Sequence, residues 1–293
     1  MKTQSQNRQP PKNHAGQGDK EMYSSLDKIA TQYAEALQRQ CRKMHRLMMA
    51  AYKSKIVPLI KKYAKERKWL ATNNRQLEDL LQRYTRMIDA EITVAMVAIY
   101  ALFDDKAIYQ ILHKFGMAVD EAQRRILLQE ILDVAGSVDP AIRAYLRDSE
   151  EEREEILEDY ESDSMDYMLV LPRDYEERVR TGMLDGLTRG LTATSMMYLL
   201  NEYYAMADRK AYFMADNMTY ELYNYLCGYT HTGMGNKYFV WLHRSWLSEK
   251  PRENHAELDG AVVRWKTGVN DGEGKTFPGE RPNCHCLAGY YGG

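Results

Sequence analysis

The sequence predicts a mainly α-helical protein that ends in a small α+β region. Over most of the chain, apolar residues recur three or four positions apart, as they do along one face of a helix. The 293 residues include only 18 glycines and 8 prolines, a content that disfavours a mainly β fold. Near the C-terminus this spacing gives way to alternating apolar residues and glycine-rich turns. We therefore expect long helices in the N-terminal part, and short strands with Gly-rich loops in a C-terminal cap.

Composition divides the chain into four stretches. Residues 1–20 are polar and rich in Gln, Asn, Pro and Gly, so we expect a disordered tail. Residues 21–147 are expected to form a helical N-terminal region. Residues 148–170 are strongly acidic, which is more typical of a solvated helix face or a linker than of a ligand site. Residues 171–293 are expected to form a C-terminal domain.

Several helix boundaries can be predicted inside the N-terminal region. Pro58 should kink or break the first helix, because proline has no N–H and its ring meets the preceding turn. Asn74 is a good N-cap for the next helix, and Gly116 and the stretch 136–140 should separate the helices that follow. The apolar stripe of the first helix consists of Leu26, Ile29, Tyr33, Leu37, Cys41, Met44 and Met48.

Three glycines spaced four residues apart, Gly182, Gly186 and Gly190, would lie along one side of a helix. They would let another backbone approach closely, although each costs about 1 kcal/mol of helix stability relative to alanine. A phosphate-binding loop is excluded here, because neither a Gly-Lys-Ser/Thr ending nor a preceding strand is present. A long aromatic helix is expected to follow over roughly 197–227.

Two short strands are expected in the C-terminal cap. Tyr238, Val240 and Leu242 alternate with other residues, which is the period of a strand. Val262 and Val263 form a second candidate among the turn residues that follow.

Composition also excludes several classes of protein. A formal net charge of −2 disfavours binding of nucleic acid over the whole surface. No apolar run approaches the length of a membrane span, and the N-terminus has no signal-peptide core. The four cysteines are too irregularly spaced for the disulfide framework of a secreted domain. We therefore expect a protein that is made in a reducing cytoplasm and does not contact membranes.

The stretches 252-RENHAELDG-260 and 278-PGERPNCHC-286 hold the most reactive side chains. His255, Cys284, His285 and Cys286 are credible ligands of a structural Zn²⁺, although Cys-x-Cys is tighter than the usual knuckle and a second thiol pair is missing. Alternatively, His255 donates to a backbone carbonyl and Asp259 accepts backbone N–H groups, so that the two hold the loop around buried thiols.

A third interpretation is catalytic. With His255 as general base, Asp259 nearby and a cation such as Lys250, Arg252 or Arg281 stabilising the developing charge, the site could cleave a phosphodiester. A disulfide within the Cys-His-Cys turn ranks last, because it would close a very small, strained loop in a reducing compartment.

The order of motifs in the C-terminal region resembles that of the phage Mu F-like minor head proteins, also called the phage head morphogenesis family. That family has a Trp-bearing strand, an Asp-x-Arg-x-Arg motif, His-x-x-Leu-Asp-Gly and a Gly/Pro-rich turn ending in Pro-Asn-Cys-Arg-Cys. This chain has Ser248, Lys250 and His285 where the family has Asp, the first Arg and the middle Arg of these motifs. The signature of the resemblance is 238–286, and the resemblance reaches back through the glycine-spaced helix near Arg180, which makes 171–293 the expected Mu F-like domain. The matching motif residues are Trp241, Arg252, His255, Leu258, Asp259, Gly260, Pro282, Asn283, Cys284 and Cys286.

The resemblance implies a low-copy minor capsid protein of a tailed bacteriophage. Such a protein associates with the portal vertex, acts in head morphogenesis and is sometimes packaged and ejected with the DNA. The implied partners are the portal protein and the major capsid or scaffolding protein, with the virion head near the portal and the host cytoplasm as its locations. No enzymatic activity is expected, and no cofactor apart from the structural zinc considered above. The alternative is a nucleic-acid-binding or nuclease-like effector delivered with the phage genome.

The segment between Gln38 and Trp69 carries eleven cations against the single acid Glu66. These cations form either the solvated face of an amphipathic helix or a surface that neutralises the phosphates of packaged double-stranded DNA, which salt would weaken. The candidate DNA contacts are Arg39, Arg42, Lys43, Arg46, Lys53, Lys55, Lys61, Lys62, Lys65, Arg67 and Lys68.

Overall fold

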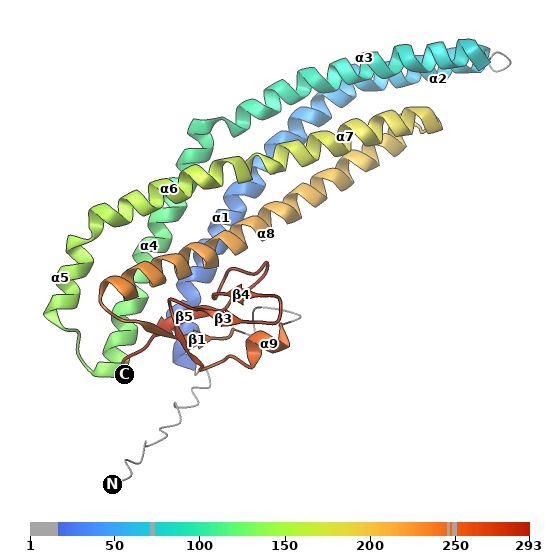
Figure 1. The fold of residues 1–293 in the computed structure, drawn as a ribbon. Coiled ribbons are helices and arrows are strands. Elements are labelled where there is room, and N and C mark those ends of the chain that lie inside the picture. The colour runs from blue at the N-terminus through green and yellow to red at the C-terminus, as the bar shows by residue number, and fades with distance from the viewer. Residues whose placement is uncertain (1–16, 71–73, 245–246, 248–250) are drawn as a thin grey trace, which may run out of the picture. The chain divides into compact units, whose positions relative to one another are not determined.

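The computed structural model describes residues 17–70, 74–244, 247 and 251–293 (Figure 1). It is mostly helical, with a small C-terminal region of short antiparallel strands, so the predicted fold class is confirmed. Within the described part of the chain, none of the helices combines the length and the apolar content that a bilayer span needs. Most of the predicted tail lies outside the described residues, and its last four residues, 17–20, already belong to the first helix.

Helices and helical turns account for most of the described chain. In chain order they are α1 (Gln17–Ala51), the π-helical turn η1 (Tyr52–Ile56), α2 (Val57–Trp69), α3 (Asn74–Tyr100), the 3₁₀ turn η2 (Ala101–Phe103), α4 (Asp105–Ala135), α5 (Pro140–Asp148), α6 (Glu150–Met168), α7 (Val170–Arg189), α8 (Ala193–Gly233) and the short α9 (Glu253–Ala256).

The predicted break at Pro58 is replaced by a π-helical turn. The backbone N–H of Val57 donates to the carbonyl of Tyr52, five residues earlier, and Pro58 sits in the first turn of α2, where a missing N–H does no harm. The chain therefore stays helical from α1 into α2.

The other predicted boundaries have mixed outcomes. Gly116 does not separate two helices, because α4 runs through it. Gly136 does end α4 with a φ of 71°, which only glycine adopts without strain. Asp139 then caps α5, where its Oδ1 accepts a hydrogen bond from the N–H of Ala141 at 2.8 Å.

Two compact units are formed by separate segments of the chain. The first contains the described residues up to Tyr33 together with 113–160 and 214–293, and the second contains 34–112 and 161–213. Helices α1, α4, α6 and α8 contribute residues to both units. Each unit thus collects helices from distant parts of the sequence, which composition alone does not reveal.

The second unit is built by helix packing. On α2 and α3, the rings of Tyr63 and Tyr84 lie 5.5 Å apart, and Tyr84 Oη donates to Glu66 Oε1 at 2.8 Å. On α7, a Cβ at Gly182 would collide with the ring of Tyr203 from α8. The expected close approach at the glycine-spaced helix is therefore present here, although a tyrosine side chain rather than a backbone fills the space.

The first unit contains the strands, which are β1 (Tyr238–Leu242), β2 (Val262–Arg264), β3 (Val269–Asn270), β4 (Lys275–Thr276) and β5 (Leu287–Tyr290). They form an antiparallel sheet in the order β2-β1-β5 and a β3-β4 hairpin. Both predicted strands are confirmed as β1 and β2. The buried residues of β1 are Phe239 and Trp241, which alternate with the apolar set that signalled the strand.

An asparagine on α8 binds the edge strand β5. The side chain of Asn224 donates from Nδ2 to the carbonyl of Cys286 at 3.1 Å, and its Oδ1 accepts from the N–H of Ala288 at 2.8 Å. The amide thus acts as a short strand partner and satisfies backbone groups that would otherwise be buried unpaired. This contact fixes the position of the thiol that directly precedes β5.

Candidate functional site

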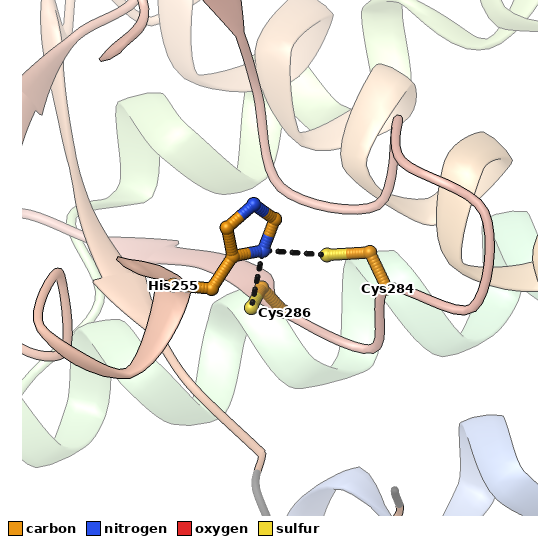
Figure 2. A group of neighbouring side chains, drawn as sticks. All are labelled: His255, Cys284 and Cys286. Atoms are coloured by element: carbon orange, nitrogen blue, oxygen red, sulfur yellow. Dashed lines mark hydrogen bonds between the residues drawn. The ribbon is translucent and has the colours of Figure 1, made fainter. Parts of the chain in front are cut away.

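Three buried side chains of the first unit converge in the C-terminal region, as Figure 2 shows. His255 Nδ1 lies 3.4 Å from Cys284 Sγ and 3.7 Å from Cys286 Sγ. The three atoms lie within 4.8 Å of one another, and all three residues are buried. The structure therefore brings together three of the four predicted metal ligands.

The local backbone explains how these residues meet. His255 lies in the four-residue helix α9, and Cys286 directly precedes β5. The turn before Cys284 contains Asn283 with a φ of 58°, a left-handed conformation that asparagine tolerates better than most residues. The N–H of Asn283 donates to Asn217 Oδ1 of α8 at 2.7 Å, so the turn is anchored to that helix.

Behind His255 lies a buried carboxylate that sequence reasoning missed. His255 Nε2 is 3.4 Å from Asp271 Oδ2, and Asp271 is bound in turn by Arg281, whose Nε and Nη2 donate at 2.8 and 2.9 Å. Chiefly because of Arg281, the pKa of Asp271 is held well below its usual range. No sequence signal marks Asp271, which lies in a Gly-rich turn sixteen residues after the histidine.

The two thiols differ in acidity because they share one negative charge. A hydrogen bond from Cys286, followed by one from His255, lowers the pKa of Cys284 below that of an ordinary thiol. The same contact with Cys284, together with burial, raises the pKa of Cys286. The hydrogen bond with Cys284 also raises the pKa of His255. A cation in this site would be attracted to the thiolate.

Asp259 makes a backbone contact in the turn that follows α9. Its Oδ1 accepts a hydrogen bond from the backbone N–H of His243 at 2.9 Å, and the N–H of Gly260 donates to the carbonyl of Trp241 at 2.8 Å. Asp259 thus holds the turn through a backbone N–H, as the interpretation as a hydrogen-bonded loop predicts. The histidine half of that interpretation needs correction, since the ring of His255 contacts thiols and Asp271 in place of a carbonyl.

The remaining motif residues surround the group without joining it. His285 Nε2 lies 2.6 Å from Asp216 Oδ2, so this histidine is directed toward α8 and apart from the three-residue group. Arg252 Nη2 donates to the carbonyl of Pro282 at 3.2 Å and ties α9 to the Cys-His-Cys turn. Leu258 helps to close the turn after α9, where its carbonyl accepts from Ala261 at 2.8 Å.

The chain also matches a known protein family in this region. Residues 177–288 match the family described as Phage Mu protein F like protein. The match covers less than half of the chain, and for this similarity we call residues 177–288 the Phage Mu F-like domain. The domain begins in α7, includes all of α8 and β1 to β4, and ends in β5. It contains the signature at 238–286 and the spaced glycines, and lies within the predicted 171–293.

A curated relative says less about the function of this chain than the family match does. An uncharacterized protein of Haemophilus influenzae is 23% identical over 146 residues, which cover 50% of this chain and 31% of that protein. The chain therefore spans less than a third of this relative. No solved structure matches the sequence.

Outside the Phage Mu F-like domain, the predicted basic surface lies in the second unit and runs along α1, η1 and α2. All eleven candidate cations are exposed, whereas Tyr52, Ile56, Ile60 and Tyr63 of the same stretch are buried. The cations therefore line the outer face of one amphipathic helical segment. We call this set of eleven residues the basic face.

Proposed function

We propose that this protein is a minor head protein of a tailed bacteriophage, bound to the portal or the inner capsid wall and active during head assembly. The observation that carries the proposal is the Phage Mu F-like domain at 177–288, with its motif residues gathered around one buried site. His255, Cys284 and Asp259 all hold parts of a compact loop region, which suits a rigid assembly module.

The basic face supports a contact with packaged DNA. Exposed Lys and Arg side chains bind phosphates by releasing condensed counterions, and this needs no pocket. Its acid Glu66 accepts a hydrogen bond from Tyr84 and pairs with Arg83 of α3, so that carboxylate is already occupied. A protein inside a filled head would meet DNA at high concentration along this face.

The test is to ask whether the protein enters phage heads. Procapsids and mature heads are purified from a phage that carries the gene, and from a deletion strain complemented with wild-type protein or with a Trp241→Ala variant. We expect the wild-type protein in procapsids, cross-linked to portal oligomers, and misassembled heads in the deletion strain. Absence of the protein from both kinds of particle, with normal heads in the deletion strain, would overturn the proposal.

A further inference from the structure

We propose that His255, Cys284 and Cys286 bind one zinc ion, with His243 as the fourth ligand. The ion would be structural and would join α9 to the turn that leads into β5. The proposal rests on the geometry of these side chains and does not depend on the role in phage heads.

The distances fit tetrahedral zinc. With Zn–S bonds of about 2.3 Å and Zn–N bonds of about 2.0–2.1 Å, a regular tetrahedron places nitrogen and sulfur ligands about 3.5 Å apart. The observed separations from His255 Nδ1 are 3.4 Å to Cys284 Sγ and 3.7 Å to Cys286 Sγ. Both nitrogen–sulfur separations therefore match those of a tetrahedral zinc site.

Hydrogen bonding explains this arrangement less well. His255 Nδ1 carries either one hydrogen or one lone pair, so it can make a strong hydrogen bond with only one of the two sulfurs. A cysteine nucleophile paired with a histidine would need only one sulfur at this nitrogen. A metal ion accounts for the convergence of both sulfurs, since each donates its own lone pair to the same centre.

The surroundings of His255 are those of a metal ligand. Histidines that bind metal usually donate their other N–H to a carboxylate or carbonyl, which fixes the ring and its tautomer. Asp271 supplies that carboxylate to Nε2 at 3.4 Å, and Arg281 holds Asp271 with two hydrogen bonds. The imidazole is thereby oriented with Nδ1 toward the thiols.

The imidazole of His243 would complete the tetrahedron by moving toward the other ligands, since neither of its nitrogens lies within 4.8 Å of all three ligand atoms. His243 follows β1, its Nδ1 lies 3.4 Å from Cys286 Sγ, and it lines a cavity of about 160 Å³ together with the three other ligands. Its Nε2 is buried and has no hydrogen-bond partner among the described residues. Two thiolates and two neutral imidazoles around Zn²⁺ carry no net charge, which suits a buried site.

The first experiment measures metal in the tag-free, full-length protein. Elemental analysis should find one zinc per chain. After chelation under reducing, anaerobic conditions, Co²⁺ titration should saturate at one equivalent and give both thiolate-to-cobalt charge-transfer bands and the visible bands of tetrahedral cobalt. Cys41→Ala, which removes a buried thiol of the second unit, should retain the full stoichiometry.

Substitutions at the proposed ligands and at Asp271 distinguish residues that bind the metal from residues that only support the fold. Cys284→Ser and Cys286→Ser should lose the charge-transfer bands, and His243→Ala should bind Co²⁺ more weakly and change its visible spectrum. Asp271→Asn, a conservative change behind the ligand, should lower affinity by about 10- to 100-fold while one equivalent still binds at saturation.

Two results would overturn the proposal. One is wild-type protein that contains no metal and takes up neither Zn²⁺ nor Co²⁺ after reduction. The other is a Cys284 thiol that reacts equally rapidly with iodoacetamide with and without added Zn²⁺, which would indicate a cysteine nucleophile that the ion does not occupy. An unaltered cobalt spectrum in His243→Ala would refute the assignment of the fourth ligand.

Discussion

Helix α2 and the C-terminal segment, residues 238–244 and 251–290, are stabilised in different ways. In α2, Ile60 and Tyr63 are buried three residues apart and the cations between them are exposed, so one helical period sorts the side chains. In the C-terminal segment, by contrast, His255 contacts residues 16, 29 and 31 positions away. Single substitutions on the helical surface should therefore change the free energy of unfolding little. Substitutions of a side chain that links distant turns should change it much more.

The largest effect is expected at a buried ion pair of the first unit. Arg153 Nε donates to Asp120 Oδ1 at 2.6 Å and its Nη2 donates to Gln123 Oε1 at 2.7 Å, and the side chains of both charged residues are almost fully buried. Because breaking such a pair leaves a buried charge, Arg153→Met should lower the free energy of unfolding by about 3 kcal/mol. Arg124 also pairs with Asp120 at 2.8 Å and limits the loss. Denaturant titration measures it.

The matched control is Arg147→Met, which removes an exposed pair with Asp148. Its effect should stay within about 0.5 kcal/mol. Equal effects of the two variants would contradict the importance given to burial.

The next effect is the dependence of folding stability on pH that His231 causes. Burial lowers the pKa of this histidine to about 4, and it packs against the rings of Trp265 and Tyr290. In the unfolded chain the pKa is about 6.5, so only the unfolded state takes up the proton as pH falls. The folded state should therefore lose about 3 kcal/mol between pH 7.5 and 4, and the loss from this group should level off below its folded pKa.

Urea titrations over that pH range compare the wild-type protein with His231→Phe. The variant keeps an aromatic ring but does not titrate, so its stability should fall less steeply. Parallel curves for the two proteins would show that His231 does not cause the acid sensitivity.

A smaller and local effect is expected at the glycine-spaced helix. Gly182→Ala gains helix propensity, but its Cβ would collide with Tyr203, and overpacking typically destabilises by about 1–3 kcal/mol. We expect a net loss of about 1 kcal/mol, relieved in the double variant with Tyr203→Leu. Additive effects of the two substitutions would contradict direct contact between these positions.

The smallest effect on stability is expected on the basic face. Replacing four exposed lysines of α2 by glutamine should change the free energy of unfolding by less than about 0.5 kcal/mol per site. It should nevertheless weaken duplex DNA binding and reduce the slope of log K against log salt by about 0.9 per lost phosphate contact. The substituted residues are Lys61, Lys62, Lys65 and Lys68.

A control variant replaces four exposed cations that lie outside the basic face. If this control lowers the slope of log K against log salt as much as the first variant does, DNA binding does not depend on the basic face in particular. The control residues are Lys106, Lys114, Arg143 and Arg147.

The sequence predicts the fold better than the site, for physical reasons. Helix period and strand alternation are local, so the aromatic helix that became α8 and the strands β1 and β2 could be located from neighbouring residues. Asp271 could not, because its role depends on a turn that folds back onto α9 and Arg281. Likewise the acidic stretch concealed Arg153, whose burial depends on Asp120 in another helix.

The separate stabilisation of the two regions can be tested by amide hydrogen exchange on wild-type protein and His255→Ala. Removal of the imidazole releases both thiols and Asp271, so exchange should become faster at 238–244 and 251–290, while amides of α2 and α3 keep their wild-type rates. An equal acceleration in α2 and α3, or unchanged protection in the C-terminal segment, would contradict the account.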